Sequence, residues 1–512
     1  MHVKRNQPAA ILWLVAIATV TSAAWAAWYL TIGMDDVVRL RYVDRYFGAS
    51  ATRTVDGRFI PAKELGNSDY CGHCHTDIFH QWDASTHHFS SFNDPYYRRV
   101  ALDVAARRGP EALKFCAGCH DPLPLLSGEM PLDNLETWSG NAGITCLSCH
   151  RIVELHGRGN GGYSVSPPTL HPFALTDRPF MQQAHKLLVK LTPFLHKKVL
   201  LKPFYSSSEY CVGCHTVRMP GAINGAAALV VQDESSHGEQ GVPAGHAPAQ
   251  TGTCQGCHMP LVRSDDPAAH DGFIHSHRFV GGNTAIPTLN RDTNQLQAAI
   301  SMLENGIVKI AIEGVTVSDG CDKHDARRCE RHAELAIRIS NPGVGHAFPG
   351  GTADSNEAWV QIGVRDALEA TLFTSGTATA GQELPPGTYT LAARYVDRHG
   401  VRTNRRTTST EAVSLEATTV LEPKEERVLH YNFPVPAGTS FPLAIEARLN
   451  WRKFSPGFSE WVFEGRAVEP PPVTLLGRAE ASFPQSAVHQ ESDHVTPITA
   501  VVDSAVSPGL RR

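Results

Sequence analysis

The chain has 512 residues, 42% of them hydrophobic, and its formal net charge is −5. This length favours roughly two to four domains, and the hydrophobic content suffices for ordinary globular cores. The negative charge and the lack of a basic stripe in the sequence argue against nucleic acid as a partner.

The N-terminus begins with an uncharged run. Lys4 and Arg5 are followed by no charged residue from Ala9 to Met34. A helix of this length spans a hydrocarbon core of about 30 Å, and Trp28 lies near its far end, where interfacial aromatic residues gather. We therefore expect residues 1–34 to be a single-pass inner-membrane anchor, with the bulk of the chain periplasmic. The alternative is a cleaved signal peptide with its site at Ala24–Ala26.

After a short stem at residues 35–66, the pattern Cys-x-x-Cys-His occurs five times, and we number these sites one to five in chain order. The pattern is typical of c-type haem attachment, in which both thiols bond to the porphyrin and the histidine ligates the iron. One copy could be a redox dithiol or half of a zinc site, but five copies favour haem. The sequence predicts five covalently bound c-type haems, attached through Cys71 and Cys74, Cys116 and Cys119, Cys146 and Cys149, Cys211 and Cys214, and Cys254 and Cys257, with proximal ligands His75, His120, His150, His215 and His258.

The segment that carries these sites is expected to form a mostly helical, loop-rich haem domain at residues 67–295. It is rich in Gly, Pro and His and lacks long apolar periodicity, as suits a domain filled by porphyrins. Helical spacing is clearest at Tyr96–Arg108, Met181–Leu191 and Asp292–Asn305, each bounded by Gly or Pro. The chain has 26 histidines, enough to give every iron a second imidazole.

The C-terminal half changes to a period of two, which is typical of strands. We expect a β-sandwich at residues 296–468 and a partly disordered tail at residues 469–512, so that the whole chain is α+β. Cys321 and Cys329 could form a disulfide or remain free thiols. The expected strands are Ile307–Val317, Ala333–Ser340, Glu357–Val364, Thr388–Asp397, Glu426–Pro434, Pro442–Trp451 and Glu460–Phe463.

Several motifs around the attachment sites resemble a known family. Site one is followed by Trp-x-x-Ser-x-His at residues 82–87, site three is preceded by Gly143-Ile144-Thr145, and site five reads Cys-Gln-Gly-Cys-His-Met-Pro at residues 254–260. These resemble periplasmic multihaem c-type cytochromes related to the tetrahaem electron acceptor of hydroxylamine oxidoreductase. The departures are the fifth haem, the N-terminal membrane segment and the added β domain.

The resemblance implies which histidines complete the coordination of the irons. It implies His87 as a distal ligand, with His88 as an adjacent alternative. It also implies His277, in a Ser-His-x-Phe-x-Gly-like stretch, and His346, in the glycine-rich run Asn341–Gly351. The region before site four is expected to supply His185, with His171 and His196 as alternatives. His246, in a Pro-Ala-Gly-His stretch, is the remaining candidate.

These predictions lead to two candidate functions. The first is a membrane-tethered periplasmic pentahaem cytochrome that transfers electrons between respiratory-chain components, with redox proteins as partners. The second is an oxidoreductase acting on nitrite, hydroxylamine or a sulfur oxyanion at a five-coordinate haem. The lack of a Cys-x-x-Cys-Lys site counts against a pentahaem nitrite reductase. The histidine surplus favours electron transfer over catalysis, and the sequence leaves open whether the chain is an enzyme.

Overall fold

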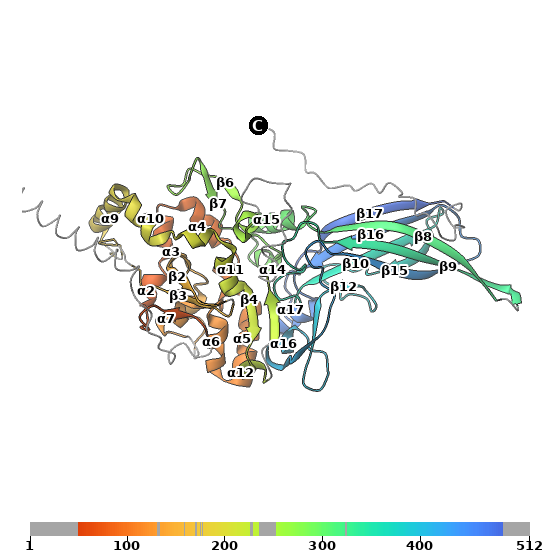
Figure 1. Ribbon diagram of the computed structural model, residues 1–512, viewed down its shortest axis with the longest axis horizontal. Helices are drawn as coiled ribbons and strands as arrows, with labels where there is room; N and C mark the ends of the chain where they lie inside the picture. The colour runs from red at the N-terminus through yellow and green to blue at the C-terminus, as the bar shows by residue number, and fades with distance from the viewer. Residues whose placement is uncertain are drawn as a thin grey trace, which may run out of the picture.

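The computed structural model describes residues 50–484, apart from residues 131–133, 158, 169–170, 175, 177, 226–228, 235–251 and 323–324. Figure 1 shows a helical part joined to a β domain, whose β8–β9 hairpin extends farthest from the helices. The expected N-terminal anchor and most of the expected tail lie outside the described residues. Within the described residues, no helix is both long enough and apolar enough to cross a membrane.

The helical part consists mainly of short helices. Its larger helices are α5 (Pro95–Arg108), α9 (Pro179–Leu191), α10 (Pro193–Leu200) and α15 (Thr293–Leu303). The others are α2 (Ala62–Leu65), α3 (Ser68–Gly72), α4 (Thr76–Asp83), α6 (Leu113–Ala117), α7 (Pro122–Ser127), α8 (Cys146–His150), α11 (Ser208–His215), α12 (Gly221–Asn224), α13 (Cys254–His258) and α14 (Ala285–Leu289).

Three small sheets lie between these helices. Strands β1 (Arg53–Thr54), β3 (Tyr163–Val165) and β2 (Ile152–Leu155) form one, and β4 (Thr216–Met219) pairs with β5 (Leu229–Asp233). The third is β6 (Leu261–Arg263) with β7 (Phe273–His275).

The ends of the larger helices follow local rules. The Asp94 carboxylate accepts hydrogen bonds from the backbone N–H groups of Tyr96 and Tyr97 and so caps α5, which stops at Gly109 with φ 86°. Asp292 caps α15 in the same way. Pro193 follows the end of α9 and is also the first residue of α10, a position that proline favours.

The β domain has two sheets around one apolar core. One sheet has the order β11-β10-β16-β17, with β12 also paired to β10, and the other has the order β15-β9-β8. Their bounds are β8 (Lys309–Asp322), β9 (Asp325–Ser340), β10 (Glu357–Arg365), β11 (Thr371–Ser375), β12 (Thr390–Leu391), β15 (Glu426–Val435), β16 (Leu443–Arg452) and β17 (Thr474–Phe483).

Alternate residues of the central strands build that core. Leu335, Ile337 and Ile339 of β9, and Val360 and Ile362 of β10, are fully buried in it. Burying each such side chain contributes roughly 1.5–3 kcal/mol. The period of two in the sequence therefore marks the inner faces of the two sheets.

Some expectations for this half are wrong in detail. Glu460–Phe463 is not a strand, because Ser455 caps a helix, α17 (Pro456–Val462), with Pro456 in its first turn. The expected tail contains β17, which pairs antiparallel with β16 from Leu443↔Phe483 to Trp451↔Thr474. The single strand expected at Thr388–Asp397 is divided into β12 and β13 (Ala393–Val396). The register of β8 and β9 sets Cys321 opposite Cys329, and their disulfide stays a prediction.

The β domain packs directly against the helical part. Helix α16 (Arg405–Glu411) lies in the chain between the paired strands β13 and β14 (Ser414–Thr418). Both α16 and α17 contact α5 (Figure 1). The Tyr96 ring of α5 lies 4.0 Å from that of Phe454, and its hydroxyl is 3.1 Å from the Ser459 hydroxyl. The Trp451 indole donates to the Gly282 carbonyl at 3.0 Å. These contacts bring the His346 loop within reach of the attachment sites.

Candidate haem-binding sites

Each attachment motif forms about one helical turn. The backbone N–H of His75 donates to the Cys71 carbonyl at 2.9 Å, and that of His120 donates to the Cys116 carbonyl at 3.0 Å. Residues three and four apart in a helix share one face, so each turn presents two thiols and one imidazole together. All ten motif cysteines are free thiols, as covalent haem attachment requires.

The proximal imidazoles are oriented through their Nδ1 atoms. Nδ1 lies 2.8 Å from the Ser90 carbonyl in His120, 2.8 Å from the Leu200 carbonyl in His150 and 2.6 Å from the Val280 carbonyl in His258. A carbonyl oxygen can only accept a hydrogen bond, so Nδ1 is the protonated nitrogen that donates it and Nε2 keeps its lone pair for a metal.

Site one differs because the hydrogen-bond partner of its proximal Nδ1 is a carboxylate and not a backbone carbonyl. His75 Nδ1 lies 2.8 Å from Oδ1 of Asp266, whose side chain is fully buried. The backbone N–H of Ala268 donates to the same oxygen at 2.9 Å. A buried anion in this position makes the imidazole a stronger electron donor than a carbonyl does.

Within the part of the chain that the structure describes, four proximal histidines face a second histidine. The ring centroids are 6.1–6.4 Å apart in every pair. The pairs are His75 with His196 (6.1 Å, planes inclined by 13°), His215 with His87 (6.2 Å, 51°), His150 with His277 (6.4 Å, 22°), and His258 with His346 (6.3 Å, 15°).

This spacing matches an iron held between two imidazoles. Metal–imidazole bonds of about 2.0–2.1 Å, plus about 1.1 Å from each nitrogen to its ring centre, separate the centroids by about 6.3 Å. In His277 and His346, Nδ1 lies 2.9 Å and 2.8 Å from the backbone carbonyls of His275 and Ala347, which leaves Nε2 for the metal. The residues present therefore fit a six-coordinate haem at these four sites.

The structure separates some of the alternatives that the sequence left open. His87 faces His215, whereas His88 stacks on Trp82 at 4.4 Å and its Nδ1 is 2.8 Å from the Asp83 carbonyl. His246 lies outside the described residues, so the second ligand at His120 stays a prediction.

His185 is not brought to a proximal histidine. It is buried, its Nδ1 lies 2.9 Å from the Pro172 carbonyl, and its ring is edge-on to His171 at 5.9 Å. The histidine across from His75 is His196, on the next helix. Its neighbours Lys197 and Lys198 indicate a basic surface patch, but His196 lies three residues before the buried Val199 of α10 and so on the same side of that helix.

Burial keeps three of the facing imidazoles neutral, and this shows in their pKa values. It lowers the pKa of His87 to about 3, and the pKa of His196 and of His277 to about 4. Metal ligation requires the neutral ring, so no proton has to be displaced at neutral pH.

The approach of His87 depends on the loop before site three. The Trp82 indole donates to the Ile144 carbonyl at 2.8 Å, and the Ile144 N–H donates to the His87 carbonyl at 2.8 Å. Gly143 has φ 65°, and a Cβ there would lie 1.9 Å from the His88 carbonyl oxygen. Only glycine permits this close packing, which explains the glycine before site three in physical terms.

The His346 loop is held from behind by the segment at residues 419–425. Phe348 and Leu421 exchange two backbone hydrogen bonds of 2.8 Å, and the Asn341 amide donates to the His346 carbonyl at 3.1 Å. A Cβ at Gly350 would lie 2.6 Å from Cε1 of His346, so the ring position requires glycine there.

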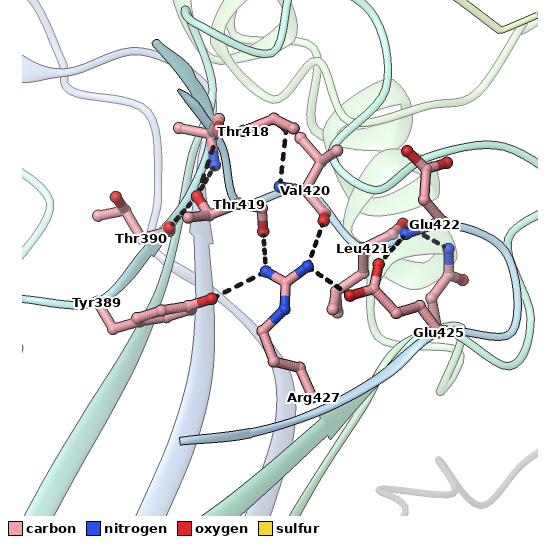
Figure 2. A network of polar contacts seen from close by, with 11 residues as sticks. Tyr389, Thr390, Thr418, Thr419, Val420, Leu421, Glu422, Glu425 and Arg427 are labelled. Atoms are coloured by element: carbon pink, nitrogen blue, oxygen red, sulfur yellow. Dashed lines mark hydrogen bonds and ion pairs between the residues drawn. The ribbon is translucent and has the colours of Figure 1, made fainter. Parts of the chain in front are cut away.

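Figure 2 shows how Arg427 fixes that supporting segment. Its guanidinium donates to the carbonyls of Thr419 at 2.8 Å and Val420 at 3.0 Å, and to the Tyr389 hydroxyl at 2.9 Å. It also pairs with the Glu425 carboxylate. These contacts hold the segment at residues 419–425, which supports the His346 loop, in one position.

The attachment sites lie against one another. The Cys119 thiol lies 3.8 Å from the Cys214 carbonyl, and the neighbouring thiols of Cys146 and Cys254 raise the pKa of Cys71 and of Cys211. Sites one and three, two and four, and four and five are therefore neighbours. The Tyr210 hydroxyl lies 2.7 Å from Cys149 Sγ and joins site three to site four. Together these contacts connect all five sites in one cluster.

Comparisons with known proteins agree with this picture. A family model for cytochrome c554 and c-prime matches residues 70–151, which include sites one to three and His87. A penta-heme cytochrome c552 from Thermochromatium tepidum has a similar structure, with a TM-score of 0.53 and 20% identity over 83% of this chain and 100% of that chain. At this identity the likeness concerns the fold.

Two further results add nothing to the assignment. A structural-genomics target matches 38% of this chain and 97% of that chain at 9% identity, with a TM-score of 0.17, which is too low to indicate a shared fold. A search of curated proteins found no match. Together with the site geometry, the family match and the penta-heme structure support a multihaem c-type cytochrome with covalently bound haem.

Proposed function

We propose that this chain is a pentahaem c-type cytochrome that transfers electrons between respiratory-chain components in the periplasm, tethered to the inner membrane by residues 1–34. The observation that carries the proposal is the set of four histidine pairs at 6.1–6.4 Å. Two imidazoles on one iron leave no exchangeable position, which suits electron transfer rather than binding of a small substrate.

The assigned ligand pairs are His75 with His196, His215 with His87, His150 with His277, and His258 with His346. For the fifth pair we propose His120 with His246, on the sequence pattern alone. Haem iron supplies one-electron oxidation and reduction when bound. The imidazoles that would hold each iron include rings already oriented by hydrogen bonds through Nδ1, so that little would have to move when the charge at the site changes.

The contacts between attachment sites support transfer through the whole cluster. Attachment sites one, three and four follow one another in space, and sites two and five both adjoin site four. With haem bound at each site, electrons that arrive at site one would have a route toward the β domain through site five, where His346 would be the second ligand.

The second candidate function requires one open iron, and site two is the place to look for it. The proposal is tested by electron paramagnetic resonance and optical spectra of the purified holoprotein, with and without nitrite and hydroxylamine. Five low-spin haems that do not respond to these ligands are expected. A high-spin haem that binds them, and that is unchanged when His246 is replaced by alanine, would favour the oxidoreductase.

A further inference from the structure

Helices α9 and α10 carry an apolar surface that the described part of the chain leaves exposed. Phe180 is 84% exposed, Leu187 58%, Leu191 65% and Phe194 62%. At about 100° per residue, Phe180, Leu187 and Leu191 project within about 40° of one another. They form a single outward stripe on α9 that continues into Phe194, near the start of α10.

Basic side chains accompany this stripe. The segment from residue 178 to residue 202 contains six basic residues and no acidic residue, in a chain whose overall charge is negative. Within the described residues, no carboxylate pairs with Lys190, Lys197 or Lys198. The basic residues are Arg178, Lys186, Lys190, Lys197, Lys198 and Lys202.

The position of the two helices in the fold exposes this surface. Figure 1 shows α9 and α10 at the end of the molecule opposite the β domain. Their inner sides are used by the haem region, because Leu195 and Val199 are buried and His196 faces His75. The outer sides carry the apolar stripe and the lysines.

We propose that α9 and α10 lie in the interface of a bilayer that contains anionic phospholipid. Phe180, Leu187, Leu191 and Phe194 insert among the acyl chains next to the headgroups, and the lysines contact lipid phosphates. A helical surface with bulky apolar residues on one face and basic residues beside it is the combination that binds such interfaces. A second copy of the chain would bring six basic residues against six, so charge disfavours it as the occupant.

The proposal has a consequence for site one that rests on the proposed function. Because His196 belongs to α10, the haem held by His75 and His196 would lie next to the membrane surface. Site one would then be the first acceptor for electrons from a donor within the bilayer.

The test uses the full-length holoprotein in vesicles that contain a phospholipid with a photoactivatable diazirine in its acyl chain. Illumination labels side chains that reach the acyl region, and mass spectrometry locates them. We expect label between residues 179 and 201 in vesicles of phosphatidylcholine with phosphatidylglycerol. Labelling should fall by about tenfold or more in phosphatidylcholine alone, because each cation near an anionic surface contributes to binding.

The double variant L187E/L191E should lose label in this segment by about tenfold or more. Leu102→Glu is the matched control, since Leu102 is 42% exposed on α5, and it should leave the labelling unchanged. Low-spin spectra and electron transfer in detergent report on folding and on the proposed function separately. Label absent from residues 179–201, label unaffected by the double variant, or crosslinking of this segment to protein instead of lipid would each overturn the proposal.

Discussion

The buried carboxylate behind His75 leads to the sharpest prediction. Asp266→Asn keeps the shape of the side chain and removes its charge from the site-one imidazole, which lies 2.8 Å from Oδ1. A carboxylate stabilises the oxidised iron, because that state carries one more positive charge. We therefore expect the variant to raise the reduction potential of the haem at site one and to leave the other four nearly unchanged.

Two estimates bound the size of this shift. Hydrogen bonds to charged groups are stronger than neutral ones by about 1 kcal/mol, and a one-electron couple moves by 59 mV for each tenfold change in equilibrium, which gives about 40 mV. A charge about 7 Å from the iron at an effective dielectric constant of about 20 contributes about 2.4 kcal/mol, or about 100 mV. The expected upward shift is thus about 40–100 mV.

The assay is a spectroelectrochemical titration of the purified holoprotein, fitted to five one-electron steps. Asp265→Asn is the matched control, because this neighbour carries the same charge but is exposed. A single step that rises in Asp266→Asn and not in Asp265→Asn would support the reasoning. Equal shifts in both variants, or no step displaced upward by Asp266→Asn, would refute it.

Four other substitutions test the assigned ligands, the loop before site three and the cap of α5. His196→Ala should convert one low-spin haem to a high-spin form in the resonance spectrum, whereas His185→Ala should not; the reverse result would return the ligand to α9. Gly143→Ala places a Cβ 1.9 Å from the His88 carbonyl oxygen, so we expect a loss of about 2–4 kcal/mol in the free energy of unfolding, measured by denaturant titration, and a wild-type midpoint would contradict this. Burial raises the pKa of the Asp94 carboxyl from 3.8 to about 6, so folding takes up a proton between these pH values and stability falls as the pH rises through about 6. Asp94→Asn keeps an equally good N-cap and should flatten this part of the stability curve; an unchanged pH profile would show that Asp94 is not its source.

The sequence predicted the attachment chemistry residue by residue because that chemistry is local. Two thiols and one imidazole must lie on one helical turn, and a five-residue motif specifies this completely. The second ligands are different, since they depend on contacts between residues that are distant in the chain. His277 and His346 are predicted only through the resemblance of their surroundings to a family.

The structure sets His196, and not His185, opposite His75, and this placement shows the limit of local reasoning. Both residues lie on helices of the same segment, and the pattern of α9 was the more regular. What separates them is which helix packs toward Cys71, and this depends on the turn at Thr192 and Pro193. The sequence contains no periodic signal for that choice.

The β domain was predicted where alternation was strong and missed where composition misled. The prolines at residues 470–472 suggested a tail, although Thr474, Leu476 and Phe483 of β17 are buried. The capped helix α17 was read as a strand because its apolar run is short. In both cases a flanking residue decides the structure, and the hydrophobic pattern alone does not.

The ligand pairs also have a consequence for biogenesis. Each facing pair joins residues far apart in the chain, such as His75 with His196 and His258 with His346. A crosslink that closes a loop of about 100 residues removes chain entropy worth roughly 4–5 kcal/mol from the unfolded state, and an iron bound on both sides is such a crosslink. The haems would then crosslink distant segments of the chain, and all five would have to be attached before folding could be completed. A failure at any one attachment site would be felt in segments that carry no cysteine at all.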